Sequence, residues 1–113
     1  MEIHDATELP SRAVTQFDSL NANWTAVARS DGACHLGRMR IGARGVVGMH
    51  PTRLDQLFIV VNGHGWVRTA DGPRRGVSAG HAVLWRAGEE HESGTDSGMT
   101  AIVAQASQLV VGE

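Results

Sequence analysis

Short apolar runs separated by glycines are the main pattern along this chain. The runs are rich in Val, Ile, Leu and Trp, and 14 glycines lie within and between them. This pattern is typical of a sandwich or barrel made of many short β-strands. We expect strands at residues 25–29, 33–41, 46–50, 56–61, 66–69, 75–78, 82–85, 91–93, 99–105 and 109–111. Helical periodicity is weak, and its best stretch is residues 11–20.

Two dipeptides in this pattern are strong local signals for β-hairpins. Asp31-Gly32 lies between the strands expected at 25–29 and 33–41, and Asn62-Gly63 lies between those expected at 56–61 and 66–69. We therefore expect each dipeptide to reverse the chain and to pair the strands on either side of it.

Alternation of side chains assigns the faces of the two most informative strands. In strand 56–61, Gln56, Phe58 and Val60 share one face, and the intervening residues form an apolar stripe on the other. In strand 46–50, Val46 and Gly48 share the face of His50. A strand that is apolar on both faces needs cover on both. We predict a homodimer whose interface includes this stripe, and the alternative is that a terminal segment, such as residues 3–20, folds over it within one chain.

Composition narrows the class of protein and the class of partner. A chain of 113 residues supports one domain. With 42% hydrophobic and 19% charged residues it has the composition of a globular protein. The formal net charge of -2 does not favour nucleic acid or an anionic membrane as a partner.

The ends of the chain and the single cysteine say little about function. The first eight residues are acidic and lack the apolar core of a signal peptide. No stretch approaches the roughly 20 apolar residues that span a bilayer, so we expect a cytoplasmic protein. The lone Cys34 excludes an internal disulfide, and we expect it to be a small buried thiol.

Two motifs resemble those of the cupin family. The first is Gly45-Val-Val-Gly-Met-His50-Pro-Thr-Arg-Leu-Asp-Gln56, closed by Gly63, and the second is Gly80-His-Ala-Val-Leu-Trp85-Arg-Ala-Gly88-Glu-Glu-His91. The short gap between them is similar to that of small bacterial members. The resemblance implies an all-β fold, a double-stranded β-helix or jelly-roll barrel. It also implies a single cupin domain over residues 1–113, with the motif-bearing core at about residues 36–105.

The resemblance also implies a pocket at the mouth of the barrel. The side chains that we expect to line this pocket are His50, Gln56, His91, Trp85, Phe58 and His35. His35 is in phase with Met39 and Ile41, so it either lines the cavity or is a surface histidine on its strand. Arg53 and Arg86, on loops near the motifs, either clamp a carboxylate of the ligand or are solvated.

The metal ligands of the family are only partly present. A full cupin site offers three imidazoles and one carboxylate, which suit Fe, Mn, Ni, Co or Zn. Here His50 and His91 match, whereas Thr52 stands at the second histidine position and Gln56 at the glutamate position. Each loss weakens metal binding by more than about tenfold, by analogy with the losses seen around metal sites. A metal held by His50, Gln56 and His91 is therefore weakly bound, or there is none.

Three functions follow as hypotheses. The first is a binding protein for a small organic molecule at the barrel mouth, with weak or absent metal dependence. The second is a divalent-metal-dependent enzyme of the oxygenase, isomerase or lyase type that uses His50, Gln56 and His91. The third is a dimeric scaffold for other proteins. The fold alone does not choose among them, because one barrel hosts many reactions.

Overall fold

The chain is built almost entirely from β-strands, as expected. The computed structural model describes residues 1–112. The elements in chain order are β1 (Glu2–Asp5), the 3-10 helix η1 (Ala6–Glu8), β2 (Ser11–Ala13), β3 (Asn23–Thr25), β4 (Ala28–Arg29), β5 (Cys34–Ile41), β6 (Val46–Pro51), β7 (Asp55–Thr69), β8 (Arg75–Ser78), β9 (His81–Trp85), β10 (Glu90–Gly94), β11 (Met99–Ala106) and β12 (Val110–Val111). No helix within residues 1–112 is long and apolar enough to cross a membrane.

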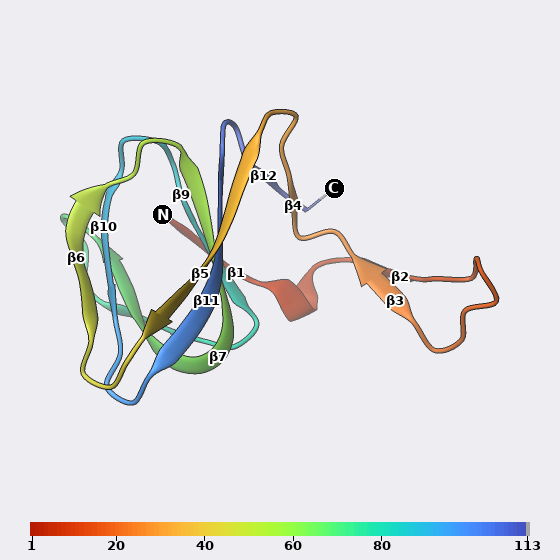
Figure 1. Ribbon diagram of the computed structural model, residues 1–113, viewed down its shortest axis with the longest axis horizontal. Helices are drawn as coiled ribbons and strands as arrows, with labels where there is room; N and C mark the ends of the chain where they lie inside the picture. The colour runs from red at the N-terminus through yellow and green to blue at the C-terminus, as the bar shows by residue number, and fades with distance from the viewer. Residues whose placement is uncertain (113) are drawn as a thin grey trace.

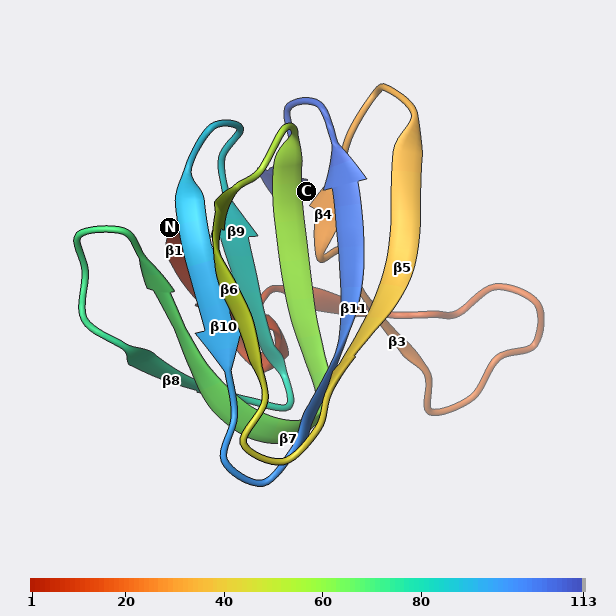
Figure 2. The ribbon, with the colours of Figure 1, turned by 60° about the vertical axis from the view of Figure 1, so that its left-hand side comes forward.

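Two antiparallel sheets face each other and share the long strand β7 (Figure 1). The first half of β7 pairs with β11 and β9, and β5 and β1 complete this large sheet at its two edges. The second half of β7 pairs with β8 and β10, and β6 is the outer strand beyond β10. Figure 2 shows β7 curving from one sheet into the other at the closed end of the barrel.

The bend in β7 lies where a hairpin was expected. Asn62-Gly63 does not reverse the chain, because residues 55–69 form one continuous strand. The register against β11 shifts between Thr100 and Ala101, and Gly63 adopts φ +79°. A Cβ atom on Gly63 would lie 2.3 Å from the carbonyl oxygen of Gly98. Asn62-Gly63 therefore forms a β-bulge at which the backbone of Gly98 approaches closely. At this bulge β7 bends from one sheet into the other.

The main core lies between the two sheets. Its buried members are Ile41, Phe58, Val60, Val67, Val77, Val83, Trp85, Met99 and Ala101. Phe58 and Val60 come from the inner face of β7, and Met99 and Ala101 come from β11 beside it. Packing of these alternating residues closes one end of the barrel and leaves the other end open.

A second apolar cluster covers the outer stripe of β7. Leu57 is buried there with Leu84 and Leu109, and Val27 and Val111 pack against them. The cover therefore comes from the same chain, as the alternative held, but from the β4–β12 region and not from residues 3–20. Residues 3–20 instead form the β1 edge, η1 and part of a projecting hairpin. Homodimerisation remains a prediction.

Two further expectations about the first third of the chain were wrong. Residues 11–20, where helical periodicity is weak, contain β2, which pairs with β3. Asp31-Gly32 does not make a hairpin, because β4 pairs with β12 while β5 pairs with β11. Cys34 is exposed instead of buried, because it begins the edge strand β5. At Asp31-Gly32, pairing with distant strands overrode a local turn signal.

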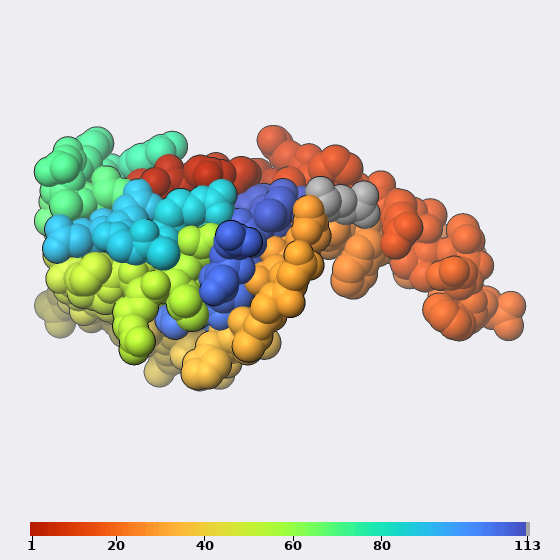
Figure 3. All heavy atoms as spheres, turned by 90° about the horizontal axis from the view of Figure 1, so that it is seen from above, coloured from red at the N-terminus to blue at the C-terminus, as the bar shows by residue number. Residues whose placement is uncertain are grey.

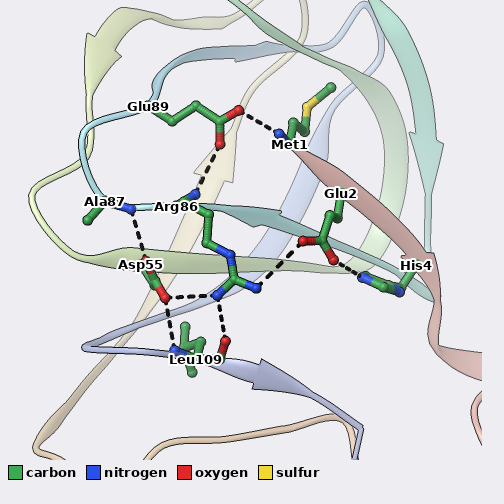
Figure 4. Close-up of polar contacts among 8 residues, drawn as sticks. All are labelled: Met1, Glu2, His4, Asp55, Arg86, Ala87, Glu89 and Leu109. Atoms are coloured by element: carbon green, nitrogen blue, oxygen red, sulfur yellow. Dashed lines mark hydrogen bonds and ion pairs between the residues drawn. The ribbon is translucent and has the colours of Figure 1, made fainter.

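A buried carboxylate joins distant parts of the chain (Figure 4). Asp55, only 7% exposed, accepts hydrogen bonds from the backbone N–H groups of Ala87 and Leu109, both at 2.9 Å. The Arg86 guanidinium lies 3.0 Å from the same carboxylate and also donates to the carbonyl oxygen of Leu109 at 2.7 Å. Its other amino group lies 3.6 Å from Glu2. Arg86 is thus engaged in this network and is not a ligand clamp.

The network also sets the protonation of Asp55. Burial by itself would raise the pKa of this carboxyl group. The hydrogen bonds from Ala87, Arg86 and Leu109, together with the charge of Arg86, outweigh burial and hold the pKa below its ordinary value. Asp55 is therefore ionised at neutral pH and accepts from all of its donors.

We expect Asp55→Asn to destabilise the fold by about 2 kcal/mol, because an amide cannot accept from every donor that the carboxylate serves. This corresponds to a melting temperature lower by roughly 10 °C. Asp96→Asn, an exposed carboxylate, is the control and should change little. A depressed carboxyl pKa stabilises the fold above the unfolded pKa of about 3.9, and this contribution is lost as pH falls through the folded pKa. The difference in the free energy of unfolding between wild type and Asp55→Asn should therefore become smaller in strong acid. An equal effect of both substitutions in thermal unfolding would contradict this role.

Candidate ligand pocket

A cavity of about 300 Å³ opens between the two sheets. One wall comes from the large sheet and the other from β6 and β10. The lining residues are His35, Leu36, Gly37, Arg38, Met39, Val47, His50, Gln56, Phe58, His91, Ser93, Val103 and Gln105. Five of the six expected pocket residues are thus brought together, and the sixth, Trp85, lies behind them.

A polar row crosses the large sheet along the cavity. Gln105 on β11 is the register partner of His35 on β5 and of Gln56 on β7. Gln56 is in turn the partner of Trp85 on β9. Directly opposed side chains on one face of an antiparallel sheet have Cβ atoms roughly 5 Å apart. The row therefore presents one imidazole and two amides side by side, and His35 lines the cavity.

The opposite wall carries a pair of histidines. His50 on β6 and His91 on β10 are register partners, and their ring centroids lie 4.4 Å apart. Nδ1 of His50 lies 2.6 Å from the carbonyl oxygen of Gly48, and Nδ1 of His91 lies 3.4 Å from that of Glu89. A carbonyl oxygen only accepts, so each Nδ1 carries a proton. In the neutral form of each ring, the lone pair is then on Nε2.

A β-bulge between β6 and β10 determines which side chains of β6 face the cavity, and it differs from simple alternation along the strand. The register runs from His91 opposite His50 to Ser93 opposite Val47, so β6 takes one more residue than β10 over this step. His50 and Val47 therefore both line the cavity. The expectation that Val46 shares the face of His50 was wrong, since the adjacent Val47 lines the cavity with His50 and Val46 does not.

An aromatic stack supports His91 from behind. The Trp85 ring lies over the His91 ring with centroids 4.3 Å apart, and Phe58 meets Trp85 edge-on at 5.8 Å. His91 is only 3% exposed. Trp85 is buried and does not reach the cavity surface, and its Nε1–H has no acceptor within residues 1–112. The stack fixes the orientation of the His91 ring.

The same burial controls the charge of His91. Desolvation of the ring lowers the pKa of His91, and the nearby imidazole of His50 lowers it further. The carbonyl and carboxylate of Glu89 oppose this shift without cancelling it. His91 is therefore neutral at neutral pH, so its Nε2 is an acceptor or a ligand and not a cationic donor.

The donor set is a poor fit for a tightly bound divalent metal. The described part of the chain, residues 1–112, contains no group of three His, Cys, Asp or Glu side chains placed to hold one. Thr52 is buried, and its hydroxyl donates to the carbonyl oxygen of Leu54 at 2.7 Å. It thus closes the β6–β7 loop and supplies no ligand. His50, His91 and the amide of Gln56 remain, with no anionic group among them.

The cavity includes residues that the motifs did not point to. Gln105 is a polar residue in phase with the inward-facing Val103 and Ala101, and this break in an apolar alternation was a usable signal. Gly37 lies opposite Val103, and a Cβ built on it meets nothing within 4 Å. The absence of a side chain there keeps this part of the cavity open. Arg53, by contrast, is exposed on the β6–β7 loop and does not line the cavity.

Comparisons with known proteins bear on the fold. No family model matches the sequence, and no curated protein matches it either. Among solved structures, a cupin-like protein from Thermotoga maritima matches with a TM-score of 0.62 and 17% identity, over 69% of this chain and 63% of that chain. A cupin 2 conserved barrel domain protein from Salinispora arenicola matches with a TM-score of 0.58 and 16% identity, over 91% and 79%.

A third solved structure is that of an enzyme. It is a DMSP lyase from Ruegeria pomeroyi, which matches with a TM-score of 0.61 and 18% identity, over 88% of this chain and 55% of that chain. At these identities the likeness concerns architecture alone. It agrees with the two sheets, the shared strand β7 and the open-ended cavity described above. The chain is therefore a small protein with the cupin fold, a double-stranded β-helix barrel.

Proposed function

We propose that this protein binds a small, uncharged organic molecule in the cavity between its sheets, without needing a tightly bound metal. The observation that carries the proposal is the arrangement of the walls. His50 and His91 present Nε2 lone pairs on one side, and the polar row with Gln56 and Gln105 lies on the other. The volume of about 300 Å³ is at the lower end of the range for small-molecule sites.

The wall chemistry favours a ligand with hydroxyl or amide groups at one end. Imidazole Nε2 accepts hydrogen bonds, and carboxamides both donate and accept. Val47, Phe58 and Val103 supply apolar surface for the rest of the molecule. The lining contains no carboxylate, and its one arginine, Arg38, lies on the edge strand β5. A ligand with a net charge would find no opposite charge deep in the cavity.

A second candidate is a divalent-metal-dependent reaction with His50, His91 and Gln56 as ligands. The observation that favours it is the anchoring of both Nδ1–H groups by carbonyl oxygens. Metal-binding imidazoles nearly always donate their second N–H in this way. A metal bound there would polarise a substrate oxygen or activate water. The missing carboxylate argues for weak binding, so we place this candidate second.

Filling the cavity should abolish ligand binding. A thermal-shift screen of small polyhydroxylated and amide-bearing molecules identifies a ligand, which at about 100 times its Kd stabilises the fold by about 2.7 kcal/mol. We expect Gly37→Leu to weaken binding of that ligand at least tenfold, because the new side chain projects into the cavity. Gly32→Leu, at a turn outside the lining, is the matched control and should bind normally. Undiminished binding in Gly37→Leu, measured by calorimetry, would place the ligand elsewhere.

Restoring the missing charge should create a better metal site. We expect the wild type to bind Ni²⁺, Co²⁺ or Zn²⁺ weakly, and Gln56→Glu to bind at least tenfold more tightly, because a carboxylate supplies the anionic ligand. Gln105→Glu, which places a carboxylate in the same polar row but on β11, is the control. Calorimetry and metal analysis by mass spectrometry give the affinities and the stoichiometry. One equivalent of metal in the native protein, lost in His50→Ala/His91→Ala, would instead support the second candidate.

Acid should weaken ligand binding through His91. The pKa of His91 is lower in the folded chain than in the unfolded chain, where it is about 6.5. The contribution of His91 to stability is therefore fully present above about pH 6.5. This contribution is lost as pH falls from there through the folded pKa, with a slope of at most about 1.4 kcal/mol per pH unit. Ligand affinity should fall over the same window as Nε2 becomes protonated. His91→Gln should remove this pH dependence, and His64→Gln, outside the lining, should keep it. An NMR titration that places the His91 pKa above 6.5 would overturn this assignment.

A further inference from the structure

The strand β5 has a backbone edge that pairs with no other strand of residues 1–112. Its one paired neighbour there is β11, so every second residue of Cys34–Ile41 directs its N–H and C=O away from the sheet. Seven of its eight residues are exposed, and β5 is the last strand of the large sheet in Figure 2. In Figure 3 the orange and gold atoms of β5 lie along the outside of the molecule. An unpaired edge of this length is a template for a further strand.

This edge borders the cavity. Five consecutive residues of β5, from His35 to Met39, line it. Because successive side chains of a strand point to opposite faces, a run of consecutive lining residues places the backbone of the strand itself in the cavity wall. The opposite lip is formed by β6, with Val47 and His50. A strand added to β5 would therefore run along the opening of the cavity.

The two faces of β5 differ in chemistry. Register through β11 places Gly37 in one row with Phe58, which belongs to the core between the sheets, and Leu36 in one row with Leu57, which belongs to the outer cluster. By alternation the inner face carries His35, Gly37 and Met39, and the outer face carries Leu36, Arg38 and Arg40. The outer face of this edge thus presents one apolar and two cationic side chains in a row.

The segment that forms both lips of the cavity is basic. Residues 32–54, which contain β5 and β6, hold four arginines and no Asp or Glu, in a chain whose net charge is -2. These arginines are Arg38, Arg40, Arg44 and Arg53, and none of them forms an ion pair within residues 1–112. Their charge attracts an anionic partner. It also disfavours pairing of β5 with the β5 of a second copy, because two basic edges would then meet.

We propose that β5 binds an extended acidic segment of another protein, which joins the large sheet as an additional antiparallel strand. Main-chain hydrogen bonds to the free edge provide affinity, and alternate side chains provide specificity. On the outer face, two carboxylates of the segment lie beside Arg40 and Arg38, and an apolar side chain lies beside Leu36. Because the added strand is antiparallel to β5, its sequence from N to C reads acidic, x, acidic, x, apolar.

The two x positions of the segment lie on the inner face, opposite Met39 and Gly37. A Cβ atom built on Gly37 meets nothing within 4 Å, so the second x side chain has space to enter the cavity. The polar row and the histidine pair suit an uncharged polar group such as that of Ser, Thr, Asn or Gln. This part of the inference rests on the function proposed above, whereas the pairing at the edge of β5 does not.

Defined peptides test the proposal. The probe is an acetylated and amidated peptide with glutamates and a leucine in this order and Ser, Thr, Asn or Gln at the x positions. We expect fluorescence anisotropy to detect its binding, and at least a tenfold loss when lysines replace the glutamates. Arg38→Glu/Arg40→Glu should reverse this preference. Arg74→Glu/Arg75→Glu, the same change of charge at exposed positions outside the cavity lining, is the control and should bind as the wild type does. Thermal unfolding verifies that both variants fold. Equal binding of the two peptides, or no effect of Arg38→Glu/Arg40→Glu, would overturn the proposal.

Methylation of the peptide backbone separates strand addition from attraction by charge alone. N-methyl groups on the peptide residues whose N–H groups point to β5 should abolish binding, whereas N-methyl groups on the alternate residues should change it little. On binding, amide hydrogen exchange followed by NMR should slow at alternate residues of 34–41. An equal effect of the two methylation patterns contradicts strand addition. Slow exchange at the same residues without peptide, in a protein that is dimeric by light scattering, would assign the edge to a second copy instead.

Gly37→Leu separates this inference from the function proposed for the cavity. We expect this variant to weaken peptide binding at least tenfold when x is Asn or Gln, because the new side chain projects into the space that the x side chain occupies. Small-molecule stabilisation without any peptide binding would overturn the present inference and leave the cavity function intact. Peptide binding that Gly37→Leu leaves unchanged, but that the N-methyl groups abolish, would support the added strand and remove the cavity from its recognition.

Discussion

The Asp55 carboxylate is the interaction on which the position of the cavity walls depends. It lies one residue before Gln56, and its partners Arg86 and Ala87 follow Trp85 directly. The starts of β7 and of the loop after β9 are thereby locked together beside the polar row. Leu109, bound to the same carboxylate, brings the chain end back over the outer face of β7. One ionised group thus joins the inner wall of the cavity to the cover of the outer face. Its low exposure makes these hydrogen bonds stronger than they would be in water.

The character of the cavity follows from burial more than from residue type. His91 is neutral because it is desolvated beneath β10 and against Trp85. His50, its register partner, is exposed at the mouth. Two chemically identical side chains therefore stand in different environments. Gln56 and Gln105 add amides whose two ends can serve donors and acceptors alike. Such walls suit recognition by shape and hydrogen bonding, and they provide little electrostatic force on a charged group.

Much of the fold could be predicted from the sequence, because strands and glycines follow simple rules of periodicity. The inner placement of Gln56 and Phe58 followed from alternation, and the approach of His50 to His91 followed from the resemblance to cupins. The wrong expectations concern places where pairing with a strand distant in the sequence determines the local structure. Asn62-Gly63 has the composition of a hairpin turn, but pairing with β11 keeps β7 continuous through it. The bulge in β6 likewise depends on its register with β10, which no local pattern encodes.

The role of Arg86 could not be found for a similar reason, because its partners Asp55 and Leu109 lie more than 20 residues away in the chain. Gln105, in contrast, could be recognised from the sequence as a polar residue at a position where alternation predicts an apolar one. The wall that contains its partner His35 has one further property. Among the strands of residues 1–112, β5 pairs with β11 alone. Strands with one neighbour open locally at lower cost than those with two. The cavity wall that carries His35 is therefore the wall expected to separate first when the barrel opens locally.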